Sequence, residues 1–157
     1  MKIYATMSTP IGMLSVACKG EFLTNISFGE SIANAKLGTS PVIEDAILQL
    51  KEYFAGKRKT FTLKLKPEGT DFQNSVWQML YSIPYGKTVS YKELAEKIGT
   101  PKACRAVGMA NNKNPIPIII PCHRVIGANG NLTGYAGGIE TKRFLLELEK
   151  HFGLTAL

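Results

Sequence analysis

Apolar residues fall into short runs over the first thirty positions of the chain, and turn sequences separate the runs. We expect strands over residues 2–8, 13–18 and 22–28, because Pro10-Ile11-Gly12 and Lys19-Gly20 between them are typical of turns. Strands joined by such short turns predict an antiparallel meander.

The spacing of apolar residues changes to that of a helix over residues 41–54, and Gly56 follows this run. Phe61, Leu63 and Leu65 then alternate with polar residues, which predicts a last strand. Pro67-Glu68-Gly69 indicates a boundary between domains. Residues 1–68 are therefore predicted to form a small antiparallel sheet covered by one helix.

The second part, residues 69–157, predicts mainly helices. Thr70 to Gln73 and Ser90 to Glu93 are capping boxes, and Gly99 ends the helix that the second box starts. Thr100 as N-cap and Pro101 as first residue predict another helix directly afterwards, so the two form a helix-turn-helix. A terminal helix is expected over 139–152, and the fold class is α+β.

Nineteen basic and twelve acidic residues give a net charge of +7, which favours a polyanionic partner such as nucleic acid. No apolar stretch has the length of a membrane span, and we expect a cytoplasmic protein. Three widely spaced cysteines and two histidines show neither a disulfide framework nor metal-ligand spacing. We expect no cofactor and no metal.

Cys122 follows the apolar run 116–120, which predicts a buried strand that holds the thiol in place. The pKa of a thiol must fall for it to act as a nucleophile near neutral pH, and His123 and Arg124 are the local groups that could lower it. His123 reaches Cys122 only if the backbone turns or a water intervenes. Glu149 on the terminal helix could hold His123. An inert buried cysteine is the alternative for an isolated Cys-His pair.

The helix after Thr100 has an unusual exposed face. Arg105 lies opposite its apolar stripe, followed by Gly108 and Asn112, and Lys102, Lys113 and Arg124 could neutralise phosphates nearby. The segment after Cys122 is rich in glycine and contains Tyr135, so it could cover a planar ligand. A solvated helix face and a turn-rich connection are the alternatives.

Five motifs in this order resemble the O6-alkylguanine-DNA alkyltransferases, a family that repairs alkylated DNA directly. They are Ser-Tyr-Lys-Glu-Leu-Ala at 90–95, Arg-Ala-Val-Gly at 105–108, Asn-Pro-Ile-Pro at 114–117, Ile-Pro-Cys-His-Arg-Val at 120–125 and Gly-Tyr-Ala-Gly-Gly at 134–138. The similarity extends from about Asp71 to Glu149 and is weaker before it.

The resemblance implies that Cys122 takes the alkyl group from guanine O6, and also from thymine O4, and keeps it as a thioether. Each molecule then acts once, without a cofactor. By the same resemblance, His123 draws the thiol proton through a water and Glu149 orients His123. Tyr91 donates to the leaving base, and Asn114 braces the helix-turn-helix against the active-site segment.

The implied partner is double-stranded DNA with the alkylated base flipped out, bound by a monomer through the minor groove. Arg105 would fill the gap, and the other predicted DNA contacts are Lys102, Gly108, Asn112 and Arg124. The base pocket would be lined by Tyr135, Ala136, Gly137 and Gly138. We do not expect the zinc that some relatives carry in the first lobe.

Three other functions are compatible with parts of the pattern. A non-catalytic alkyl-lesion-binding protein would lack a cysteine at position 122. A helix-turn-helix regulator needs more base-reading side chains than Arg105, Gly108 and Asn112. A thiol hydrolase would turn over repeatedly instead of once.

Overall fold

The computed structural model describes residues 1–154, and the chain divides into two units, Met1–Glu68 and Gly69–Leu157. Each unit has buried apolar residues of its own. Across residues 1–154, no helix combines the length and apolar character that crossing a membrane requires.

The first unit is built on one sheet. The strands β1 (Lys2–Thr9), β2 (Gly12–Lys19) and β3 (Phe22–Phe28) form the predicted antiparallel meander. A fourth strand, β4 (Lys36–Leu37), is not indicated by the sequence pattern and pairs in parallel with β1, which gives the order β3-β2-β1-β4. Two residues are too few to show an alternation.

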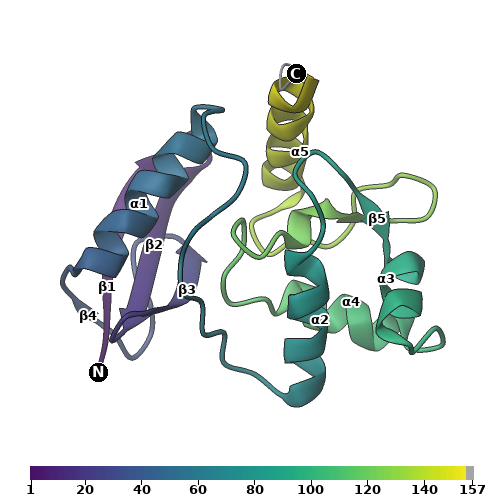
Figure 1. Ribbon diagram of the computed structural model, residues 1–157, viewed down its shortest axis with the longest axis horizontal. Helices are drawn as coiled ribbons and strands as arrows, with labels where there is room; N and C mark the ends of the chain where they lie inside the picture. The colour runs from purple at the N-terminus through teal and green to yellow at the C-terminus, as the bar shows by residue number, and fades with distance from the viewer. Residues whose placement is uncertain (155–157) are drawn as a thin grey trace. The chain divides into compact units, whose positions relative to one another are not determined.

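Helix α1 (Pro41–Phe54) covers one face of this sheet (Figure 1). The Ser40 hydroxyl accepts a hydrogen bond from the Ile43 amide, and Pro41 occupies the first turn, so the helix begins where its sequence predicts. Its buried side carries Ile43, Ala46, Gln49, Leu50 and Tyr53.

The predicted strand at Phe61, Leu63 and Leu65 is wrong. This segment is extended but makes a single bridge, between Leu65 and Leu23 of β3. The side chain of Gln49 explains the difference, because its Oε1 accepts from the Thr62 amide at 2.9 Å and its Nε2 donates to the Thr62 hydroxyl at 3.1 Å. A helix side chain therefore accepts the hydrogen bond that this backbone amide would otherwise form with a neighbouring strand.

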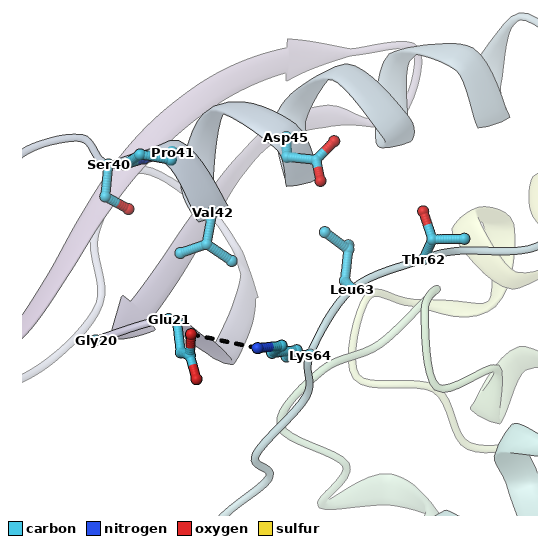
Figure 2. Close-up of a pocket in the computed structure, with 9 residues that line it drawn as sticks. All are labelled: Gly20, Glu21, Ser40, Pro41, Val42, Asp45, Thr62, Leu63 and Lys64. Carbon is cyan, nitrogen blue, oxygen red and sulfur yellow. Dashed lines mark ion pairs between the residues drawn. The ribbon is translucent and has the colours of Figure 1, made fainter.

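A cleft of about 450 Å³ opens in the first unit between the start of α1 and residues 62–64 (Figure 2). Glu21 and Lys64 form an ion pair of 3.3 Å at its edge, and Asp45 adds a second carboxylate. None of the residues that the sequence assigns to catalysis or DNA binding is among the described residues that line this cleft.

The second unit begins with α2 (Asp71–Tyr81), and the Thr70–Gln73 capping box is formed as predicted. Val76, Trp77 and Leu80 are buried, and the Trp77 indole N–H donates to the Ala110 carbonyl at 2.9 Å. This bond fixes α2 to the second helix of the helix-turn-helix.

The helix-turn-helix consists of α3 (Tyr91–Ile98) and α4 (Cys104–Asn112). The Ser90–Glu93 capping box and the left-handed Gly99, with φ of 88°, confirm the predicted limits of α3. The predicted start of α4 is wrong. Thr100 instead opens a turn in which its carbonyl accepts from the Ala103 amide, and α4 begins at Cys104 without a side-chain cap.

The apolar run before Cys122 is buried but is not a strand. Pro117 and Ile120 pair across a tight turn in which Ile118 adopts a φ of 75°, a conformation that is rare for a β-branched residue. The 3₁₀ turn η1 (Cys122–Arg124) follows, then β6 (Val125–Ile126), which pairs in parallel with β5 (Val89–Ser90). Helix α5 (Ile139–Leu154) ends the described chain.

Candidate active site

Cys122 lies at the start of η1, on a backbone that turns twice. Pro121 has φ −81° and ψ 67°, and the Cys122 amide donates back to the Ile120 carbonyl at 2.8 Å. The Arg124 amide then donates to the Pro121 carbonyl at 3.0 Å. Consecutive residues of an extended chain would point to opposite faces, whereas this turn can present the thiol and His123 to one site.

Asn114 holds the segment in front of Cys122. Its Nδ2 donates to the Ile120 carbonyl at 2.7 Å, and its Oδ1 accepts from the Ile116 amide at 3.0 Å. Asn114 follows α4 by two residues, so one buried side chain joins the helix-turn-helix to the Cys122 segment. The resemblance predicts this bracing geometry, and the bonds also restrain the unusual turn at Ile118.

Glu149 of α5 is the centre of a buried polar network. Its Oε2 lies 2.6 Å from His123 Nε2, and Arg124 donates to both carboxylate oxygens, through Nε at 2.8 Å and Nη2 at 3.0 Å. The Gly86 amide donates to Oε1 at 3.1 Å. Burial alone would raise the pKa of Glu149, but the hydrogen bonds from His123 and Arg124 and the charge of the Arg124 guanidinium outweigh it and hold that pKa well below its usual range. The carboxylate is therefore ionised at neutral pH.

The charge on Glu149 fixes the tautomer of His123. Burial lowers the pKa of His123 and outweighs the opposing effect of Glu149, so the imidazole is neutral near pH 7 and carries one proton. A carboxylate can only accept hydrogen bonds, which places that proton on Nε2. Nδ1 is left as a proton acceptor, and no described protein group donates to it.

Arg124 is buried, whereas a residue that binds DNA must lie at the surface. Its side chain is 7% exposed, and its remaining donor, Nη1, is used on the Ile83 carbonyl at 2.7 Å. The prediction that Arg124 neutralises a phosphate is therefore wrong. The guanidinium is inside the unit because it compensates the buried charge of Glu149.

Burial raises the pKa of the Cys122 thiol to about 11, although a hydrogen bond with Asn114 and the charge of Lys142 oppose the rise. The thiol is then almost entirely un-ionised at pH 7. The sequence-based expectation of a lowered thiol pKa is wrong for the protein alone, because loss of hydration is the largest effect on this group. The proton of Cys122 must be removed during the reaction.

Lys142 of α5 is a site residue that the sequence analysis missed. Its side chain is fully buried, its Nζ donates to the Thr133 carbonyl at 2.9 Å, and its charge favours the Cys122 thiolate. A signal for it exists, because Lys142 precedes Glu149 by seven residues and therefore shares its helix face. A lysine on the buried side of a helix requires a partner.

Tyr91 and Tyr135 both lie close enough to Cys122 to respond to its charge. Burial raises the pKa of each phenol, and a thiolate at Cys122 would raise both further. The Tyr91 hydroxyl donates to the Thr133 carbonyl at 3.1 Å, the same oxygen that Lys142 binds. Side chains from α3, α5 and the glycine-rich segment thus lie near Cys122.

The predicted base-pocket residues form a turn directly before α5. The Gly138 amide donates to the Tyr135 carbonyl at 3.0 Å, and Gly138 has a φ of 93°, which favours glycine. Tyr135 and Gly137 are half-buried, while Ala136 and Gly138 are exposed. The turn places Tyr135 near Cys122 and leaves Ala136 and Gly138 at the surface.

The predicted DNA contacts other than Arg124 lie at the surface of the helix-turn-helix. Lys102, Arg105 and Asn112 are exposed. Gly108 is half-buried and faces α3 as well, since a Cβ added to it would lie 3.8 Å from the Tyr91 ring. Among residues 1–154, no group of three or more His, Cys, Asp or Glu side chains is placed to hold a metal ion.

Comparison with known families accounts for nearly the whole chain. Residues 2–67 match the 6-O-methylguanine DNA methyltransferase, ribonuclease-like domain, and residues 71–151 match the DNA binding domain of the same enzyme family. The chain belongs to this methyltransferase family. The resemblance found in the sequence is thereby confirmed.

Individual relatives of the chain support its assignment to this methyltransferase family. The methylated-DNA–protein-cysteine methyltransferase of Methanosarcina acetivorans is 52% identical over 151 residues, covering 93% of this chain and 97% of that protein. The protein of the same name from Bacillus subtilis, described as constitutive, is 46% identical over 159 residues, covering 96% of each.

Solved structures confirm the predicted α+β fold class. Mycobacterium tuberculosis OGT in complex with DNA has a TM-score of 0.90 at 52% identity, covering 95% of this chain and 93% of that one. The O6-methylguanine DNA methyltransferase of Methanococcus jannaschii has a TM-score of 0.67 at 30% identity, covering 93% of both chains.

Proposed function

We propose that this protein repairs O6-alkylguanine in DNA by moving the alkyl group irreversibly onto Cys122. The observation that carries the proposal is a buried thiol on the same 3₁₀ turn as a histidine whose Nε2 is bound to Glu149, which leaves its Nδ1 free to accept a proton. Membership of the methyltransferase family supports the same reaction.

The proposed reaction begins when His123 Nδ1 takes the Cys122 proton, directly or through one water. The sulfur attacks the alkyl carbon, a C–S bond forms and the bond from that carbon to guanine O6 breaks. The electron pair of the broken bond stays on guanine, which then takes up the proton. Tyr91 and Lys142 both donate to the Thr133 carbonyl and lie close enough to Cys122 to respond to its charge, and they are proposed to stabilise the charge that builds on the base.

Recognition of the lesion is proposed to require base flipping, since O6 is shielded inside a duplex. The helix-turn-helix enters the minor groove, Arg105 occupies the gap, and Lys102 and Asn112 contact the backbone. The flipped base stacks against Tyr135 and lies along Ala136, Gly137 and Gly138. Gly108 supports the close approach of α4.

The alkylated thioether has no group nearby that would release the alkyl, so one protein molecule is proposed to repair one base. The same chemistry would accept O4-alkylthymine. We propose that the protein acts as a monomer, in the cytoplasm where it has access to DNA. Cys122 disfavours the alternative of a non-catalytic lesion-binding protein.

The test is mass spectrometry of the intact protein and its peptides after incubation with a duplex containing O6-methylguanine. We expect one methyl group on Cys122 and one guanine restored per protein molecule. Cys104 and Cys18 serve as internal controls, because they should stay unmodified, and Cys122→Ala should gain no mass. Tight binding of the lesion without any gain in mass would contradict the proposal and support the lesion-binding alternative.

A further inference from the structure

Met109 is an exposed apolar side chain on α4, the helix proposed to enter DNA. Its side chain is 57% exposed, whereas Val107, Ala110 and Asn111 form the buried side of the helix. Met109 follows Arg105 by four residues, and at 100° per residue the two lie about 40° apart on the same face. The methionine therefore points to the side from which Arg105 extends.

The surroundings of Met109 favour a nucleic-acid partner over an apolar protein surface. Lys102, Arg105 and Lys113 are all exposed in or beside α4, and no acidic residue occurs between positions 97 and 139. Such a surface attracts phosphates, and an apolar side chain within it would be in contact with sugars and base edges. Methionine is flexible enough to adapt to an irregular groove.

We propose that Met109 is a second, apolar contact of α4 with duplex DNA and that it stabilises the opened duplex beside Arg105. The proposal rests on the function proposed above. Four residues of a helix advance about 6 Å along its axis, which is close to two base steps of about 3.4 Å. Met109 would thus pack against the sugar and base edges about two steps from Arg105, and other minor-groove proteins also use apolar side chains there, as wedges between base steps.

The test compares repair of O6-methylguanine in a duplex and in the same strand without its complement. Met109→Ala and Met109→Gln should lower the second-order rate constant on the duplex about tenfold, because they remove the apolar surface or replace it by an amide of similar length. Met109→Leu should keep the rate within about threefold of wild type. The single-strand rate should be unchanged in all three variants, since no duplex has to be opened.

Leu48→Ala is the matched control, since Leu48 is 56% exposed on α1 in the other unit and should leave both rates unchanged. The proposed contact is wrong if Met109→Gln repairs the duplex as fast as wild type, or if Met109→Ala lowers the rate constant equally on both substrates. An equal loss in Leu48→Ala would also overturn it. A wild-type protein that transfers no methyl group to Cys122 from either substrate would instead overturn the proposed function, and this contact with it.

Discussion

Cys122, His123 and Glu149 each lie where a charge is stable only beside a partner. Glu149 has partners in His123, Arg124 and the Gly86 amide and is ionised, whereas Cys122 has only partial compensation and is not. In the resting site, His123 therefore has a proton acceptor in Nδ1, and the Cys122 sulfur still carries its proton. Keeping the thiol neutral until a substrate arrives also protects it from oxidation, since the thiolate is the form that oxidants attack.

His123→Ala should slow methyl transfer at pH 7 by about a hundredfold or more, because the proposed general base is lost. The pH dependence should change as well. In the wild-type protein the pKa of His123 is lowered, so the rate should stay level well below pH 6.5. In the variant, only solvent can ionise a thiol with a pKa of about 11, so the rate should rise in proportion to hydroxide between pH 7 and 9. Rapid-quench measurements of methyl transfer would give both profiles.

His151→Ala is the matched control, because His151 is the other histidine of the chain and is exposed on α5. We expect it to repair DNA like the wild-type protein at every pH. Parallel pH profiles for wild type and His123→Ala would contradict the role of His123 as base.

At the scale of elements, the Arg124–Glu149 pair joins three segments that are distant in the chain. Arg124 belongs to η1, Glu149 to α5, and the Ile83 carbonyl lies in the loop after α2. Arg124→Ala should lower the free energy of unfolding by about 3–5 kcal/mol, because it leaves the Glu149 carboxylate buried without a cationic partner, His123 being neutral at pH 7. Urea denaturation at pH 7 measures this loss.

The comparison variant is Arg143→Ala, which removes an exposed pair with Glu140 on the same helix and should cost less than about 1 kcal/mol. The loss from Arg124→Ala should also depend on pH. Because the folded-state pKa of Glu149 is lowered, its stabilisation is present above about pH 4.3 and is lost as the pH falls further. A loss that is the same at pH 3 and pH 7 would contradict this account.

Helices with side-chain caps were the elements that the sequence predicts best. Ser40, Thr70 and Ser90 each bond to an amide of the first turn, so the starts of α1, α2 and α3 follow from local residues alone. The strand at 61–65 and the helix start at Thr100 failed for a different reason. In the first case Gln49 of α1 binds the backbone amide of Thr62, and in the second a turn replaces the expected cap.

The residues of the candidate site divide in the same way, into those that local sequence reveals and those that depend on distant partners. Cys122 and its neighbours are recognisable because they form a continuous motif, and Glu149 could be named because it lies beside an apolar stripe. Arg124 was misassigned and Lys142 was missed, since a cation is expected at the surface unless its buried partner is known. Burial of both becomes predictable only when Glu149 and Thr133 are placed next to them.

At the scale of the whole molecule, the formal net charge differs from the charge that exposed side chains can present to DNA. Residues 69–157 contain ten basic and six acidic residues, but Arg124, Lys142 and Glu149 are buried and cannot meet a phosphate. Lys102, Arg105 and Lys113 are the exposed cations in and beside α4. Since α4 is the helix proposed to enter DNA, the electrostatic part of binding should depend mainly on these three residues.

Lys102→Gln should weaken binding to damaged and undamaged duplexes by similar factors, because a phosphate contact carries no sequence information. One released counterion fewer should also make the slope of log K against log salt shallower by about 0.9. Lys51→Gln, an exposed lysine on α1 of the other unit, is the control and should keep the wild-type slope. Fluorescence anisotropy from about 50 to 200 mM salt would measure both, within the range over which such slopes are linear. An unchanged slope in Lys102→Gln would remove this lysine from the DNA interface and leave Arg105 and Lys113 as the cations in and beside α4 to test next.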